Sequence, residues 1–186
     1  MLIKDLVINI PRNIRNKKIK KYIPANPVLL DLGCGKNFYL LGSLKNKIKR
    51  GHGVDINIKN KKMGNIETTR LSVYDKLPFN KNTFNVVSMI AFIEHIDKPD
   101  KIVRECNRVL THGGRLIITT PTRRAKPFWE TLVKMGLTDE PGIESHKHYF
   151  TLGELSSILK NNGFKVLESK RFEFGMNSFI VGEKLK

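Results

Sequence analysis

Val28-Leu29-Leu30-Asp31-Leu32-Gly33-Cys34-Gly35 is the stretch of this 186-residue chain that decides its fold. An apolar run of strand length carries one acidic residue and is followed by a turn with two glycines one residue apart. Glycine adopts positive φ readily and lets the backbone approach a ligand with no side chain in between. Strands that end in such a turn bind nucleotide-like cofactors at the carboxyl edge of a parallel sheet.

Strand and helix patterns alternate along the rest of the chain. Strands are expected at 28–32, 52–56, 70–73, 85–90, 115–120, 164–174 and 178–183, and helices at 38–48, 99–110 and 152–159. Thr151 with Glu154 three residues later is typical of a capping box, and Gly163 is expected to end the last helix. The alternation predicts an α/β fold with a doubly wound, mainly parallel sheet in a single domain over residues 1–186.

The neighbours of the glycine turn narrow the choice of cofactor. The dinucleotide fingerprint needs a third glycine three residues after Gly35, where Phe38 stands, so NAD is disfavoured. The phosphate-binding loop needs Ser or Thr after Gly35-Lys36, where Asn37 stands, so nucleoside triphosphate chemistry is disfavoured too.

The composition is strongly basic, with 34 Lys+Arg against 17 Asp+Glu, a formal charge of +17 and a pI near 10.0. The densest basic cluster precedes the first strand and comprises Arg12, Arg15, Lys17, Lys18, Lys20 and Lys21. A short amphipathic helix or arm between Pro11 and Pro24 accounts for it, with binding to an anionic partner as the sharper alternative. An excess of lysine spread over solvated faces accounts for the charge equally well.

Other features predict a cytoplasmic protein. No apolar run approaches the roughly 18–20 residues that cross a bilayer, and the start of the chain lacks the pattern of a secretory signal. Cys34 and Cys106 fall in the glycine turn and in a predicted helix, so we expect no disulfide.

Four segments, in the expected order, resemble the class I S-adenosylmethionine-dependent methyltransferases. They are VLLDLGCG at 28–35, GVDI at 53–56, LPFNKNTFNVVSMIAFIEHI at 77–96 and RVLTHGGRLIITTP at 108–121. The Leu-Pro-Phe, Glu-His, Arg-Val-Leu and Gly-Gly elements within the third and fourth segments resemble the branch that acts on quinones, lipids, glycans and small molecules. The resemblance implies a Rossmann-like, seven-stranded sheet in three α/β/α layers, S-adenosylmethionine as cofactor and S-adenosylhomocysteine as product.

The resemblance also implies the cofactor-binding residues. They are Asp31, Leu32, Gly33, Cys34, Gly35, Asp55, Ile56, Val73, Tyr74 and Ile90. The backbone of the glycine turn would line the methionine and ribose, and Asp31 would orient the turn or accept from the cofactor's amino group. Asp55 would accept from both ribose hydroxyls, for which its two oxygens are suited, and Ile56 would pack on the adenine.

Two positions depart from the family pattern. Asn37 stands where relatives usually carry glycine, and we expect it to take the left-handed conformation that Asn tolerates. Val73 stands where the adenine-binding acid is usual, so adenine would rely on backbone near Val73 and Tyr74, or on Asp75.

The acceptor side is expected to be formed by a basic cap, 1–24, and an insertion, 121–150, that holds Phe128 and Trp129. That aromatic pair suits an apolar or ring-bearing acceptor, or serves as a plug that holds the segment down. His95, His146 and His148 could act as a general base, although Glu94-His95 is more simply explained as a cap or packing unit. No set of three or four metal ligands is evident from spacing, so no metal is expected.

Three functions remain open. The first is methylation of a small-molecule, lipid or glycan acceptor. The Asn/Asp-Pro-Pro-aromatic motif for exocyclic amines is absent after the fourth strand, where Ile90-Ala91-Phe92-Ile93 stands, and no cysteine is placed to attack a pyrimidine. The second is an RNA-directed methyltransferase that uses the basic surface, and the third is a cofactor-binding partner subunit without catalysis. The sequence does not define the oligomeric state.

Overall fold

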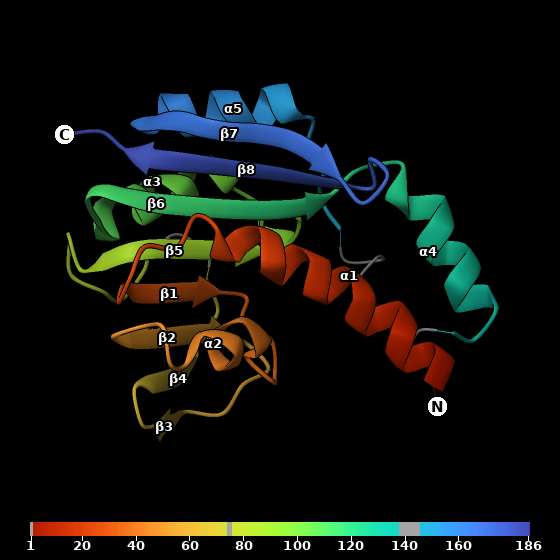
Figure 1. The fold of residues 1–186 in the computed structure, drawn as a ribbon. Coiled ribbons are helices and arrows are strands. Elements are labelled where there is room, and N and C mark those ends of the chain that lie inside the picture. The colour runs from red at the N-terminus through yellow and green to blue at the C-terminus, as the bar shows by residue number, and fades with distance from the viewer. Residues whose placement is uncertain (1, 74–75, 138–145) are drawn as a thin grey trace.

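A computed structural model describes residues 2–73, 76–137 and 146–186, and side chains from residue 10 onward within these ranges. Its centre is an eight-stranded sheet with the strand order β3-β4-β2-β1-β5-β6-β8-β7 (Figure 1). Strands β4, β2, β1, β5 and β6 are parallel, and β8 runs antiparallel between β6 and β7. The expected Rossmann-like fold is confirmed, and the short antiparallel β3 adds one edge strand to the seven expected.

The helices and strands have the following bounds. The strands are β1 Val28–Leu32, β2 Arg50–Asp55, β3 Lys61–Met63, β4 Ile66–Arg70, β5 Phe84–Ile90, β6 Leu110–Pro121, β7 Phe164–Phe172 and β8 Asn177–Lys184. The helices are α1 Leu2–Lys20, α2 Tyr39–Leu44, α3 Pro99–Val109, α4 Ala125–Lys134 and α5 Leu152–Asn161, with a 3-10 turn, η1, at Ile93–His95.

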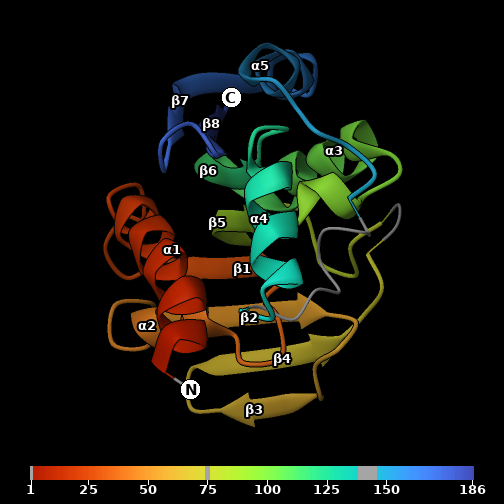
Figure 2. The same cartoon turned by 90° about the vertical axis from the view of Figure 1, so that its right-hand side faces the viewer.

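Helices cover both faces of the sheet, which gives the three layers. Figure 2 shows α1 and α2 on one side of the sheet and α3 and α5 on the other. The α1/α2 face buries Ile19, Leu29, Leu41, Ile117 and Phe179. The opposite face buries a larger cluster that includes Leu30, Met89, Val103, Leu159 and Ile180. Since successive strand residues point to opposite faces, the buried strands read as continuous apolar runs.

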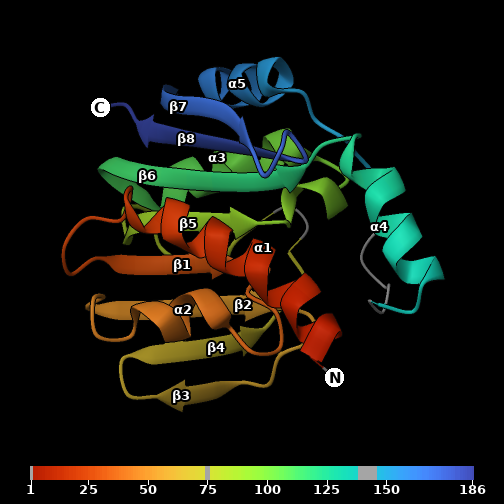
Figure 3. The ribbon, with the colours of Figure 1, turned by 45° about the vertical axis from the view of Figure 1, so that its right-hand side comes forward.

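The order of the strands reverses between β1 and β5. Ligands bind outside the carboxyl ends of the strands at such a switch point. The first turns of α1 and the whole of α4 lie beyond that edge of the sheet (Figures 1 and 3). The switch point therefore makes the carboxyl edge of β1 and β5, on the side where α1 and α4 lie, the expected place for a ligand.

Two expected strands are corrected. The third was expected at 70–73, but β4 is Ile66–Arg70 and pairs with β2 from Gly51↔Ile66 to Asp55↔Arg70. Its alternation of buried Ile66 and Thr68 with exposed polar residues was too weak a pattern to detect. The strand expected at 115–120 begins at Leu110, because Leu110 already pairs with Phe84 before the register shifts and Arg115 pairs with Val86.

The helices are corrected more extensively. The α1 helix continues through Pro11, which was expected to bound it, although proline inside a helix removes one backbone hydrogen bond and its ring crowds the carbonyl four residues back. The α2 helix covers only six of the residues expected at 38–48, and α4 forms inside the segment expected to be irregular. At α5, the capping box of Thr151 and Glu154 is confirmed.

Among the residues that the structure describes, no helix combines the length and the apolar character needed to cross a bilayer.

Candidate functional site

The glycine turn after β1 is held against the end of β2. The N–H groups of Gly33 and Cys34 both donate to the carbonyl of Val54, at 2.8 and 3.2 Å. Gly33 and Gly35 have φ of 73° and 69°, where any other residue is strained. A Cβ at Gly33 would lie 2.3 Å from Cδ2 of Phe92, so the turn also needs glycine for space.

Asp55, at the end of β2, fastens this turn. Its Oδ2 accepts from the N–H of Gly35 at 2.9 Å, and its Oδ1 accepts from the N–H of Asn57 at 2.8 Å. The carboxylate is partly exposed, and each oxygen keeps a second lone pair for a ligand. The carboxylate of Asp55 therefore links the end of β2 to the glycine turn, a contact that was not predicted from the sequence.

The left-handed residue near the turn is not the expected one. Phe38, with φ of 36° and ψ of 47°, takes this conformation directly before α2. Asn37 has no positive φ and instead donates through Nδ2 to the hydroxyl of Tyr39 at 3.0 Å. The prediction for Asn37 is wrong because the chain reverses one residue later, where α2 starts.

Asp31 is 2% exposed and lies at the centre of the switch point. Its Oδ1 accepts from the Ser88 hydroxyl at 2.7 Å, which links β1 to β5. Burial raises the pKa of Asp31 to about 7, the Ser88 hydrogen bond opposes the rise, and the charge of Asp55 adds to it. A buried carboxyl with this pKa is prepared to receive a cationic partner.

A cavity of about 320 Å³, here called the Asp55 cavity, opens beside the end of β2. Its lining includes Asp55, Ile56, Val73, Phe92 and His95. Ile56 is 54% exposed, whereas Val73 is 7% exposed, so one side of the cavity is an apolar wall. Of the predicted adenine-side residues, the structure brings Asp55, Ile56 and Val73 together, and Tyr74 lies outside the described residues.

A second cavity of about 150 Å³, here called the Asp31 cavity, lies on the other side of the turn. It is lined by Arg12, Arg15, Asn16, Asp31, Gly33, Cys34, Tyr39, Leu40, Ile90 and Ala91. The guanidinium of Arg12 also stacks on the ring of Tyr39, 3.6 Å from its centroid. This cavity combines one carboxylate with two guanidinium groups, which complements an α-amino acid that carries both charges.

Two predicted residues line neither cavity. Leu32 is fully buried in the core and supports the turn from below. A Cβ at Gly35 would meet nothing within 4 Å, so this glycine faces open space.

Seven buried polar atoms lack a hydrogen-bond partner in the described part of the chain. They are Arg15 Nε, both oxygens of Glu94, Thr119 Oγ1, Thr120 Oγ1, Glu173 Oε1 and Ser178 Oγ. These six residues, here called the polar edge, all lie at the carboxyl edge of β5 and β6 or beside it. Buried polar groups in native proteins are nearly always paired, so this concentration points to a bound polar ligand.

Glu94 is fully buried, at 0% exposure, as are Thr119 and Thr120 of the polar edge. Its carbonyl accepts from the N–H groups of Lys147 and His148, at 2.9 and 3.2 Å. These two hydrogen bonds hold the segment of His146 against η1. The Nε2 atom of His146 lies 4.0 Å from Oε1 of Glu94, and its ring centroid lies 5.0 Å from that of His95. The Nδ1 atom of His146 lies 3.4 Å from the hydroxyl of Tyr149.

Burial is the main cause of the shifted pKa values of Glu94 and His146. It raises the pKa of Glu94 to about 7, against the opposing effects of the Thr120 hydroxyl and the Arg15 charge. Burial, with the neighbouring His95, lowers the pKa of His146 to about 4. His148 is placed apart, with its ring against Phe150 at 5.4 Å.

Both cysteines are free and poorly suited to nucleophilic attack. Burial is the main cause that raises the pKa of each thiol, and only the thiolate is a strong nucleophile. The side chain of Cys34 packs against β2, where a Cβ at Gly53 would meet its Sγ at 2.9 Å.

Arg15, Glu94 and the hydroxyls of Thr119 and Thr120 were not predicted as site residues, and His95 was more simply explained as a cap or packing residue. The basic cluster and the Thr-Thr pair at a strand end are visible in the sequence. Nothing in their spacing shows that they meet, because they come from separate segments.

This geometry agrees with the known proteins that the chain resembles. A family described as "Methyltransferase domain" matches residues 9–169. The chain therefore belongs to this family, within the class I S-adenosylmethionine-dependent methyltransferases, and is an enzyme of that class.

Individual relatives are more distant. The ubiquinone/menaquinone biosynthesis C-methyltransferase UbiE of Campylobacter jejuni is 24% identical over 192 residues, which cover 88% of this chain and 81% of the relative. A ubiquinone biosynthesis O-methyltransferase of Psychrobacter arcticus is 24% identical over 155 residues, 75% of this chain and 60% of the relative. A solved SAM-dependent methyltransferase from Aquifex aeolicus has a TM-score of 0.68 at 17% identity and covers 91% of this chain and 89% of its own.

Proposed function

We propose that this methyltransferase modifies a small-molecule acceptor with a polar ring or hydroxyl group, bound at the polar edge next to the methyl donor. The concentration of unpaired buried polar atoms at one edge of the sheet carries the proposal. Leaving such a group unpaired costs about 1–3 kcal/mol, and a ligand that pairs with it recovers that free energy.

The cofactor contacts are proposed as follows. Asp55 accepts from the ribose hydroxyls while it holds Gly35, and Ile56 and Val73 pack on the adenine in the Asp55 cavity. Asp31 accepts from the cofactor's ammonium group in the Asp31 cavity. Arg15, whose Nε is buried without a partner, donates to the cofactor's carboxylate.

Several observations support this fit. No described atom lies within 4 Å of the Cβ position of Gly35, and the hydrogen bond from Gly35 to Asp55 links the turn that lines one cavity to a lining residue of the other. Their charges complement an amino acid on one side, and their apolar wall suits a flat ring on the other.

The residues contribute mainly position to the reaction. When bound, the cofactor supplies a methyl group activated by a sulfonium. The turn and Asp55 fix one reactant, and the polar edge fixes the other, so that the reacting atoms meet in line. Holding two reactants in this way supplies effective molarities of about 10⁵ M or more.

The proposed class of acceptor rests on the relatives and on two aromatic residues of α4. Two relatives are named for methylation in quinone biosynthesis, and we propose a related ring-bearing acceptor for this chain. Phe128 and Trp129 on α4 support a ring-bearing molecule, since their rings pack edge to face, 5.6 Å apart, beyond the sheet edge. A lipid or glycan with a free hydroxyl is the next class to test.

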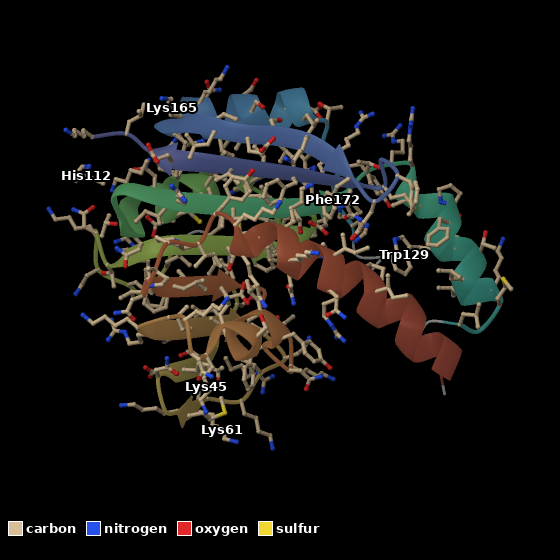
Figure 4. All side chains as sticks on the ribbon, in the orientation of Figure 1. Lys45, Lys61, His112, Trp129, Lys165 and Phe172 are labelled. Carbon is tan, nitrogen blue, oxygen red and sulfur yellow. The ribbon has the colours of Figure 1, made fainter. Side chains whose placement is uncertain are left out.

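The positive charge is partly spread over the surface and partly concentrated on α1. Figure 4 shows Lys45 and Lys61 at one end of the molecule and Lys165 at the other. The basic cluster Arg12, Arg15, Lys17, Lys18, Lys20 and Lys21 lies on α1 or directly after it, so RNA stays in the test as the alternative acceptor.

The test uses the full chain with S-adenosylmethionine labelled on its methyl group. Hydroquinones, phenols, lipid-linked glycans and total RNA serve as acceptors, and label is expected in the hydroxylated ring compounds. Label in RNA, with binding that weakens steeply with salt, would favour the RNA alternative. If calorimetry detects no binding of S-adenosylmethionine, the proposed cofactor contacts are wrong.

Arg15→Gln tests the proposed carboxylate contact. Its affinity for S-adenosylmethionine is expected to fall about tenfold, because a charge-assisted hydrogen bond is lost. Lys17→Gln, an exposed change on the same helix, is the matched control and should leave the affinity unchanged.

A further inference from the structure

Glu94, His95 and His146 form a cluster that no step of methyl transfer requires. Each offers one ligand atom, and the three atoms lie within 4.8 Å of one another. Glu94 and His95 belong to η1, whereas His146 comes from the segment before α5. Sequence spacing gave no sign of this set, since the third member is remote along the chain.

The main chain holds the cluster together. The two hydrogen bonds from Lys147 and His148 to the Glu94 carbonyl fix the segment that carries His146. The position of His146 therefore does not depend on one flexible side chain. Preorganised ligands of this kind distinguish a binding site from a chance approach.

Glu94 gives independent evidence for a ligand. Its side chain is fully buried, and neither carboxylate oxygen makes a hydrogen bond of normal geometry to a described residue. The Thr120 hydroxyl and the Arg15 charge favour the ionised carboxylate but do not offset its burial. Its Oε1 faces Nε2 of His146 at 4.0 Å, too far for a hydrogen bond. An ionised carboxylate without a partner is costly to bury, and a cation between these atoms removes that cost.

The orientation of His146 suits coordination. Its Nδ1 faces the Tyr149 hydroxyl at 3.4 Å, so Nε2 is the atom directed at Glu94. Histidines that bind metals are usually oriented in this way by a partner on the other ring nitrogen.

The donor set defines the class of cation. Two imidazole nitrogens and one carboxylate oxygen suit zinc, cobalt or manganese, whereas magnesium prefers oxygen ligands throughout. Metal–ligand distances of about 2.0–2.2 Å bring ligand atoms to roughly 3.4 Å apart, so the cluster needs to contract by about 1 Å.

We propose that Glu94, His95 and His146 bind one divalent transition-metal cation at the mouth of the acceptor site. Three protein ligands leave at least one position open, as in catalytic rather than structural sites. His95 also lines the Asp55 cavity, so the open position lies beside the cofactor side of the site. On the proposed function, an acceptor oxygen takes this position, and the cation lowers the pKa of its hydroxyl.

The test titrates the chelator-treated full chain with Co²⁺ and records the visible absorption of the bound ion, with calorimetry for Zn²⁺. One equivalent is expected to bind with the spectrum of a four- or five-coordinate site. Glu94→Gln and His146→Ala are each expected to weaken binding by about 30-fold or more, since each removes a ligand.

Two matched controls are available. His148→Ala lies in the same segment outside the cluster, and His112→Ala removes an exposed histidine. Both should bind Co²⁺ as the unchanged chain does. The proposal is overturned if binding is not saturable, if the controls lose it equally, or if Mg²⁺ displaces Co²⁺ at equal concentration.

Calorimetry with S-adenosylmethionine on the same samples separates the possible failures. A variant that still binds the cofactor is folded, so its loss of Co²⁺ is a local effect. If the unchanged chain binds the cofactor and no cation, the metal proposal alone is wrong. If it binds a cation and no cofactor, the proposed cofactor contacts are wrong and the metal site stands.

Discussion

The two halves of the site are built in opposite ways. In the cofactor half, the ends of β1 and β2 meet through short-range turns, and Gly33, Gly35 and Asp55 have hydrogen-bond partners. In the acceptor half, the members of the polar edge other than Arg15 come from η1, β6, β8 and the turn before β8, and they hold buried polar atoms with no hydrogen-bond partner among the described residues. The glycine turn and Asp55 are hydrogen-bonded without a ligand, whereas the buried polar atoms of the acceptor half need one.

The largest test of this contrast removes the carboxylate that completes the cofactor half. Asp55→Ala should weaken binding of S-adenosylmethionine about 100-fold, because hydrogen bonds to charged groups contribute about 1.5–3 kcal/mol each. Calorimetry measures the affinity. Glu67→Ala, on the neighbouring strand β4, is the control and should change little. Equal affinities for the two variants would show that Asp55 serves only the fold.

A pH series sharpens the role of Asp31. Its pKa is raised to about 7 in the free protein, and the cofactor's ammonium group favours the ionised form. Binding therefore releases a proton below this pH, so the affinity should rise up to about tenfold per pH unit and level off above about 7. Asp31→Asn should flatten this dependence, and a profile that the variant leaves unchanged would contradict the assignment.

The same residue predicts how the cofactor-free protein responds to pH. Because the folded pKa of Asp31 is above its unfolded value of 3.8, its contribution to the free energy of unfolding is greatest at low pH. That contribution is lost as the pH rises toward about 7. Asp31→Asn should remove this loss in urea unfolding measured at several pH values.

A pair of hydroxyl deletions compares the two halves directly. Ser88→Ala leaves Asp31 without its donor and should lower the free energy of unfolding by about 1 kcal/mol. Thr119→Val removes a buried hydroxyl that has no hydrogen-bond partner among the described residues, so stability should stay equal or rise. Urea unfolding gives both values. If Thr119→Val is the more destabilising change, the hydroxyl is structural and the contrast between the halves fails.

The smallest expected effect concerns the helix that joins the halves. Tyr39→Leu removes the ring under Arg12 and should release α1 by about 0.5–1 kcal/mol, seen as faster amide exchange in that helix. Tyr39→Phe retains the ring and should exchange as the unchanged chain does. Equal exchange in both variants would mean that the stacking does not hold α1.

The contrast also explains what sequence could predict. The glycine turn and Asp55 are local features whose geometry follows from residue type, and the structure places them at one edge. Glu94 and His146 meet only through the path of the whole chain, which no periodicity encodes. The prediction for Asn37 was partly right. A left-handed residue near the turn was expected, but it is Phe38 that adopts this conformation.

Gly33 has a consequence for how this protein can change over time. Any replacement there must adopt φ of 73° and also displace Phe92, which lines the Asp55 cavity. Gly35, with φ of 69° and no atom near its absent Cβ, bears the strain alone. Of the two glycines, Gly33 is therefore the less tolerant of mutation. A library of variants selected for folding should be depleted at Gly33 before Gly35, whichever acceptor the enzyme acquires.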